Sequence, residues 1–324
     1  MNIQRLASTL VAASLLLAST LAVAADWPAK PIRLIVPFGP GSTPDLVARI
    51  VAEKLTPTLG QPVVVENRPG AGGNIGTDAV AKAVPDGYTL GVTISGPLAA
   101  NTLLFKKLPY KPQQDLDFIT IAVSQPSVLV VDAKTGVSDM NALLETLRQH
   151  PGQYNYSSMG TGSISHMAME AVGSRSETEI VHVPYTGSAQ AVTAILAGEV
   201  QMAVLPAAAV MPHVQAGKLK AIAVATAKRS SLLPDLPTLS EAGLINIEGD
   251  AWIGFIAPAK TPTAITTRLQ AEIAKIVSSD EVKKKLATQY MEPVGSTAAQ
   301  FHSTVKADLE RWAPIIKKNN IAMD

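Results

Sequence analysis

The 324-residue chain contains no cysteine, few aromatic residues and few charged ones. The absence of cysteine excludes disulfide bonds, thiolate metal sites and a lipid anchor attached through a thiol. Because only 4% of the residues are aromatic, alanine, valine, leucine and isoleucine must fill most of the core. Hydrophobic residues make up 47% of the chain, which is enough for a large core, and the length suits two domains.

The first 25 residues differ from the rest of the chain. Arg5 precedes an apolar run over residues 6–23, and small residues follow at the spacing that a signal peptidase needs. We therefore predict a secretory signal peptide over residues 1–25, cleaved near Ala24 or Ala25, and a periplasmic protein. Loss of this leader would remove one base and no acid, leaving equal numbers of each. That balance excludes nucleic acid and anionic membrane surfaces as expected partners.

Short apolar runs alternate with helical patterns. Strands are predicted at residues 32–36, 62–66 and 88–94, with a helix after each of the first two. The alternation predicts an α/β fold with a parallel sheet covered on both faces, and it resumes in the second half of the chain. Both halves therefore resemble doubly wound lobes.

No charged or Ser/Gly-rich linker separates the two halves. We expect the chain to cross on strands near residues 122–125 and to return near residues 249–252. This division places residues 26–124 and 251–324 in a first lobe and residues 125–250 in a second. Two crossing strands make a hinge, and a hinge beside a cleft suits ligand capture.

Four turns rich in glycine and hydroxyl residues follow predicted strands. Ligands of open α/β sheets bind at such places, where the free N–H groups of a helix start can hold a carboxylate. The first turn could equally be an ordinary capped turn, whereas the third resembles an anion-binding nest. The candidate ligand-binding residues are Phe38, Gly39, Gly41, Ser42, Thr43 and Asp45 in the first turn; Ser95 and Gly96 in the second; Ser158, Gly160, Thr161, Ser163 and His166 in the third; and Tyr185, Gly187 and Ser188 in the fourth.

Catalytic and cofactor motifs find no support in the sequence. His166, His182 and His213 have spacings that match no metal motif, and we expect each of them to be structural. The glycines of residues 70–76 fall at the wrong offsets for a dinucleotide loop, and there is no G-x-S-x-G. We expect a protein that is not an enzyme and that uses no cofactor and no metal.

Several longer motifs carry a family resemblance. They are PIRLIVPF at residues 31–38, VVVENRPGAGGNIG at 63–76, PDGYTL at 85–90, HVPY at 182–185, AGKL at 216–219, PDLPT at 234–238 and EPVGS at 292–296. Together they resemble the Bug family, the TctC-like extracytoplasmic receptors of tripartite tricarboxylate transporters. The resemblance implies a type II periplasmic-binding-protein architecture that closes on its ligand like a Venus flytrap. It also implies a small carboxylate ligand and, as partners, the membrane subunits of such a transporter; a monomer is the default expectation.

The resemblance also implies where the ligand is held. Family members bind a ligand carboxylate through the turn that matches residues 38–45, partly by bridging waters. The second lobe contributes the turns that match residues 158–163 and 185–188. Ser42 replaces one of two adjacent glycines found in many members, and Leu205 with Pro206 replaces an Asp-Asn pair. Many members place this pair facing the cleft, so the resemblance implies that Leu205 lines the site, without a carboxylate that could pair with a ligand ammonium. We also expect a di- or tricarboxylate or an aromatic carboxylate rather than an amino acid.

Two other functions compete with transport. The same fold could serve as a ligand-sensing receptor that docks to a membrane sensor kinase, and the sequence alone does not separate these roles. An exported hydrolase or isomerase is disfavoured because no credible pair of nucleophile and base is present.

Overall fold

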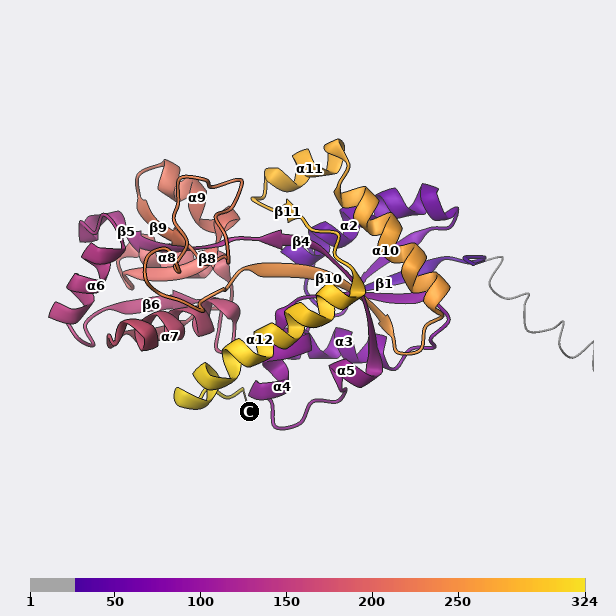
Figure 1. The fold of residues 1–324 in the computed structure, drawn as a ribbon, viewed down its shortest axis with the longest axis horizontal. Helices are drawn as coiled ribbons and strands as arrows, with labels where there is room; N and C mark the ends of the chain where they lie inside the picture. The colour runs from indigo at the N-terminus through magenta and orange to yellow at the C-terminus, as the bar shows by residue number, and fades with distance from the viewer. Residues whose placement is uncertain (1–26, 324) are drawn as a thin grey trace, which may run out of the picture.

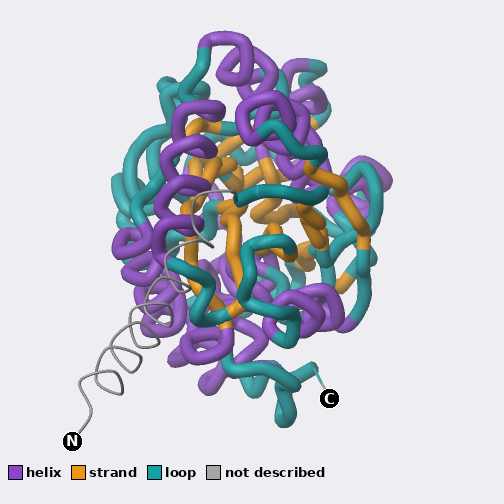
Figure 2. The backbone as a smooth tube through the Cα atoms, turned by 90° about the vertical axis from the view of Figure 1, so that its right-hand side faces the viewer, coloured by secondary structure: helices purple, strands orange, loops and turns teal. Residues whose placement is uncertain are grey.

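The structure is a computed structural model that describes residues 27–323. The predicted leader and its cleavage site lie outside the described residues. Two sheets form the two ends of the molecule, and the long strands labelled β4 and β10 in Figure 1 run between them. Seen from one end, the strands lie inside and helices cover them on both sides (Figure 2). The fold is thus the predicted α/β architecture with two sheets. None of the helices in the described part of the chain is long and apolar enough to cross a membrane.

The first sheet has six strands in the order β11-β4-β10-β3-β1-β2. Their bounds are β1 Ile32–Val36, β2 Val63–Asn67, β3 Thr89–Thr93, β4 Leu116–Gln125, β10 Ala251–Pro258 and β11 Glu292–Pro293. The first three strands are mutually parallel, as the sequence predicts. Ile32, Leu34, Ile35 and Val36 are all fully buried, because β1 lies inside a sheet that is covered on both faces.

The second sheet has five strands in the order β7-β6-β8-β5-β9. Their bounds are β5 Ser127–Asp132, β6 Asn155–Ser158, β7 Val181–Pro184, β8 Met202–Pro206 and β9 Leu219–Val224. β6 runs parallel to β7 and β8, whereas β5 runs antiparallel to both of its neighbours.

The predicted parallel arrangement is confirmed for β1, β2 and β3, whereas other strands of both sheets pair antiparallel. In the first sheet β10 is antiparallel to β3 and β4, and Ala251 pairs with Gln125. The cause is the connection between the sheets: β4 carries the chain out of the first sheet and β10 carries it back. Strands that leave and return side by side must run in opposite directions. β5 follows β4 with only Pro126 between them, so it enters the second sheet already directed against the strands that follow.

Helices cover both sheets. Around the first sheet they are α2 Thr43–Leu59, α3 Asn74–Ala81, α10 Thr263–Val277, α11 Asp280–Ala287 and the short α4 Asn101–Leu104 and α5 Pro112–Asp115, and around the second they are α6 Met140–Gln149, α7 Ile164–Ser176, α8 Ser188–Ala197 and α9 Ala207–Gln215. Helical turns also occur at η1 Ala71–Gly73, η2 Gly96–Ala100 and η3 Ala133–Thr135. The segment from η2 to α4 was not predicted, because its residues show no clear apolar period.

The last helix, α12 Ala298–Lys318, joins both ends of the molecule. It starts with a capping box between Thr297 and Gln300. Phe301 packs in a core cluster of the first sheet, whereas Trp312 packs in the core of the second. Figure 1 shows the same course, from the first sheet toward α7. At the end of α12, Lys318 donates a hydrogen bond to Ser174 of α7 at 2.7 Å.

Candidate functional site

The four candidate turns form two pairs at the carboxyl ends of strands. In the first sheet, the turns after β1 and β3 are neighbours because these strands are paired. In the second sheet, Tyr185 donates its backbone N–H to the Ser158 carbonyl at 3.1 Å, which joins the third and fourth turns. Leu104 of α4 reaches across from the first pair, since a Cβ at Gly162 would lie 2.6 Å from its side chain.

The first turn leaves donors free at the start of α2. Ser42 occupies the N-cap position, yet its hydroxyl makes no capping hydrogen bond. That hydroxyl is buried and has no hydrogen-bond partner. The N–H groups of Thr43 and Asp45 have no acceptor within the helix, since the first turn of any helix lacks them. An uncapped helix start beside an unsatisfied hydroxyl is a site where an anion would find donors ready.

Asp45 serves the turn itself. Its carboxylate accepts hydrogen bonds from the Gly41 N–H at 2.9 Å, from Arg49 at 3.0 Å and from Asn67 at 2.9 Å. Burial raises the pKa of this carboxyl, but the hydrogen bonds outweigh burial and hold the pKa below its ordinary value. Both oxygens are engaged by the protein, so Asp45 shapes the loop and offers little to a ligand.

The Asn67 side chain supports the first turn, a role that the sequence did not predict. It donates to the Phe38 carbonyl at 2.9 Å as well as to Asp45, so it ties β2 to the first turn. Gly76 continues this support, because a Cβ there would lie 2.6 Å from the Cα of Pro37. The glycine-rich motif at residues 63–76 thus packs directly behind the first turn. In the sequence, only the presence of this motif pointed to a special role for residues 63–76.

The second turn uses its hydroxyl within the protein. Ser95 donates to Asp308 of α12 at 2.6 Å, and the same carboxylate accepts from Trp252 at 3.0 Å and from Arg311 at 2.9 Å. Burial raises the pKa of the Asp308 carboxyl. Gly96 begins η2 directly afterwards. Because Ser95 and Asp308 lie 213 residues apart, no local pattern could have paired them.

The third turn satisfies most of its own polar groups, which weakens the expected anion nest. Ser163 is the N-cap of α7. The internal bonds are Met159 N–H to Ser165 Oγ, Gly160 N–H to Ser158 Oγ, Gly162 N–H to His166 Nδ1 and Ser163 Oγ to the Gly160 carbonyl. What remains toward solvent is the exposed Thr161 and the first N–H groups of α7.

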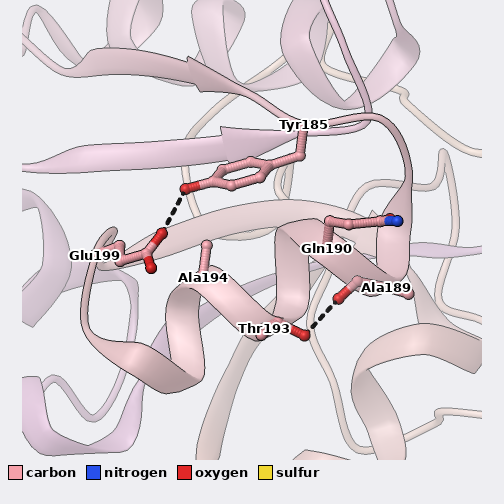
Figure 3. Close-up of a pocket in the computed structure, with 6 residues that line it drawn as sticks. All are labelled: Tyr185, Ala189, Gln190, Thr193, Ala194 and Glu199. Atoms are coloured by element: carbon pink, nitrogen blue, oxygen red, sulfur yellow. Dashed lines mark hydrogen bonds between the residues drawn. The ribbon is translucent and has the colours of Figure 1, made fainter.

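The fourth turn directs its aromatic ring toward Glu199. The Tyr185 hydroxyl donates to Glu199 at 3.0 Å, and the ring lies along α8, over Ala194 (Figure 3). A shallow hollow follows this surface, lined by Tyr185, Ala189, Gln190, Thr193, Ala194 and Glu199. It contains no residue of the other three turns. Gly187 and Ser188 form the start of α8, where N–H groups are free.

Leu205 does not reach a surface in this structure. Its side chain is fully buried in β8 and packs in the core with Val128 and Val130. The alternation of strand residues explains this, since positions on one face of β8 turn toward α8 and α9. Among residues 27–323, no group of three or more His, Asp and Glu side chains could hold a metal ion.

Comparison with known proteins gives a consistent assignment. Residues 47–321 match the family described as "Tripartite tricarboxylate transporter family receptor". Protein BugT of Bordetella pertussis is 37% identical over 298 residues, covering 91% of each chain. The structure titled "R. palustris Rpa4515 with adipate" matches with a TM-score of 0.80 and 34% identity, over 91% of this chain and 99% of that one.

Two further solved structures agree. MatC (Rpa3494) from Rhodopseudomonas palustris, solved with bound malate, matches with a TM-score of 0.75 and 29% identity over 90% of this chain and all of MatC. The periplasmic binding protein BugD matches with a TM-score of 0.76 and 29% identity, over 92% of this chain and all of BugD. The match thus spans both sheets. The chain belongs to the Bug family of tripartite tricarboxylate transporter receptors, which are periplasmic solute-binding proteins.

Proposed function

We propose that the protein captures a small dicarboxylate between its two lobes and presents it to the membrane subunits of a tripartite tricarboxylate transporter. The observation that carries the proposal is the start of α2, where the buried Ser42 hydroxyl has no partner and the helix is uncapped. A carboxylate placed there would accept from Ser42 and from backbone N–H groups. Neutral donors of this kind can bind an anion in a protein that lacks a basic field.

The relatives support the ligand class. Rpa4515 was solved with adipate and MatC with malate. Both of these ligands are small dicarboxylates without an ammonium group. In this chain the pair Leu205 and Pro206 provides no carboxylate for a ligand ammonium. We therefore place dicarboxylates ahead of acidic amino acids.

The proposal includes closure of two lobes. We take residues 26–124 with 251–324 as the first lobe and residues 125–250 as the second, hinged where β4 and β10 cross. The second lobe would add the starts of α7 and α8 to the carboxylate at the start of α2. We also propose export to the periplasm with cleavage near Ala24 or Ala25.

The test is a thermal-shift and calorimetric screen of the mature protein, unfolded and refolded first to remove any carried ligand. Adipate, malate, citrate, benzoate and aspartate form the panel. A ligand present at 100 times its dissociation constant should stabilise the folded state by about 2.7 kcal/mol. We expect such a shift with adipate or malate, which lack an ammonium group, and none with aspartate. Binding of aspartate alone would overturn the ligand class, and no binding at all would overturn the site.

Ser42→Ala locates the site. We expect this variant to unfold at the wild-type temperature, because the hydroxyl makes no bond in the free protein, and to bind the dicarboxylate about tenfold more weakly. Ser303→Ala, at an exposed position of α12 outside the four turns, is the matched control and should leave stability within about 0.5 kcal/mol of wild type and affinity unchanged. Unchanged affinity in Ser42→Ala would place the carboxylate elsewhere.

A further inference from the structure

Three rings lie in a stack behind the third and fourth turns. The imidazoles of His166 and His182 are parallel within 10°, with centroids 3.8 Å apart, and the Tyr156 ring stacks on His182 at 5.0 Å. The three side chains come from three different elements, β6, α7 and β7. The function proposed above makes no use of them.

Each imidazole holds a different point of the third turn. The Gly162 N–H donates to His166 Nδ1 at 3.1 Å. The Ser158 hydroxyl shares a hydrogen bond with His182 Nε2 at 2.7 Å. Ser158 and Gly162 lie at the two ends of the turn, so the pair of histidines clamps it at both ends.

The turn needs such a clamp because of its backbone. Gly160 and Gly162 have φ angles of 115° and 75°, conformations that glycine adopts freely and other residues rarely do. With two such glycines in three residues, the backbone of this turn could adopt many alternative conformations if no hydrogen bonds fixed it. The two histidine bonds add to those within the turn. Fixing one shape in advance lowers the entropy that a ligand must remove on binding.

The clamp requires a neutral His166. A protonated imidazole donates at both nitrogens, so its Nδ1 could no longer accept from Gly162. The other titratable groups that face the pair are Tyr156 of β6 and Glu170 of α7; Glu170 accepts from the Tyr156 hydroxyl and lies 3.8 Å from His166 Nε2. Burial and then the neighbouring His182 lower the pKa of His166 to about 4, and burial lowers the pKa of His182.

We propose that His166 and His182 are positioning residues: by holding Gly162 and Ser158, they set the third turn in the shape that receives the ligand. The proposal rests on the function proposed above and assigns a role to the HVPY motif. His166 itself is buried, so it acts through the turn and not by touching the ligand.

Paired substitutions separate the hydrogen bonds from the rings. Asparagine can place an oxygen near the position of imidazole Nδ1, and glutamine can place its terminal amide near Nε2. His166→Asn and His182→Gln should therefore keep affinity for adipate and malate within about threefold of wild type, measured by calorimetry at pH 7.5. His166→Leu and His182→Leu should each weaken it about tenfold. Wild-type affinity in both leucine variants would overturn the proposal.

The pH profile distinguishes positioning from a merely structural role. As the pH falls toward 4, wild-type affinity should fall relative to His166→Asn, whose amide does not titrate. The ligand's own protonation cancels in this ratio. A structural role alone would change the unfolding temperature and leave the ratio flat.

Hydrogen exchange in the absence of ligand tests whether the histidines hold the third turn, whatever ligand the protein binds. Hydrogen exchange of the Gly162 amide, followed by NMR, should be slow in wild type and in His166→Asn, and at least about tenfold faster in His166→Leu. If wild type binds neither dicarboxylate, the ligand proposal fails while this result still decides the clamp. Equal exchange in all three proteins would overturn it.

Discussion

Asp250 carries a carboxyl at the point where the chain returns to the first sheet, directly before β10. Burial raises its pKa to about 6, with repulsion from Asp308 and Glu248 adding to the effect and Arg311 opposing it. Since the ordinary value is 3.8, the folded protein holds this proton more tightly than the unfolded chain. The associated stability is complete below pH 3.8 and is lost as the pH rises through 6.

Asp250→Asn should therefore stabilise the protein at pH 8, where the folded protein carries this carboxylate in its charged form, and change little at pH 4. A pKa shift of this size corresponds to on the order of 2–3 kcal/mol. Urea unfolding at the two pH values measures the difference. Asp235→Asn, at an exposed position, is the control and should change stability by less than about 0.5 kcal/mol. An equal effect of Asp250→Asn at both pH values would contradict the assignment.

At the scale of elements, β2 and α3 act together as the support of the first turn. Asn67 holds the turn by hydrogen bonds, and Gly76 allows the start of α3 to approach Pro37 closely. The rigidity of the first turn, which we propose to bind the ligand, therefore depends on how closely β2 and α3 pack against it. This is the general way in which rigid elements position functional loops.

Gly76→Ala should disturb this support. The new Cβ would lie 2.6 Å from the Pro37 Cα and 2.8 Å from the Arg68 carbonyl oxygen, and backbone atoms cannot move aside cheaply. We expect a loss of about 1–3 kcal/mol in chemical unfolding. Gly39→Ala in the same turn is the matched control, because no atom lies within 4 Å of its Cβ. Its stability should stay within about 0.5 kcal/mol of wild type; a comparable loss in both variants would argue against close packing as the cause.

At the scale of the whole molecule, three segments connect the two sheets. β4 and β10 are the strands that the sequence indicates, and α12 is the third connection. Its buried Trp312, Ile315 and Ile316 lie in the second core, whereas Phe301 and Val305 lie in the first. Any opening of a cleft must bend α12 or lift its second half from α7, so this helix should limit how far the lobes separate.

Trp312→Ala should loosen that limit. Removing a fully buried tryptophan costs about 3–5 kcal/mol and leaves a cavity between α12 and the second sheet. We expect a larger radius of gyration in small-angle X-ray scattering of the ligand-free variant, recorded well below its unfolding temperature. Leu147→Ala empties part of the same core from α6 without touching α12, and it should destabilise without expansion. Identical scattering curves for the two variants would contradict this role of α12.

Most elements could be predicted from local sequence. The apolar run at β1, the glycine that ends α2 and the capping box of α12 are features of a few neighbouring residues, and all three agree with the structure. Where the candidate turns fall along the chain follows from the same patterns. The motifs at residues 63–76 and 182–185 indicated the family. They did not show what each of their residues does in the folded protein.

What each turn does with its polar groups was decided only by the tertiary structure. Ser95 and Ser42 look alike in sequence, yet the first is engaged by Asp308 from the far end of the chain and the second is left without a partner. His166 of α7 and His182 of β7 meet only because the fold brings these two elements together. Most of the secondary structure depends on residues a few positions apart, so the sequence by itself determined that part. Hydrogen-bond partners and strand directions depend on how distant segments pack, so they were set only when the chain folded.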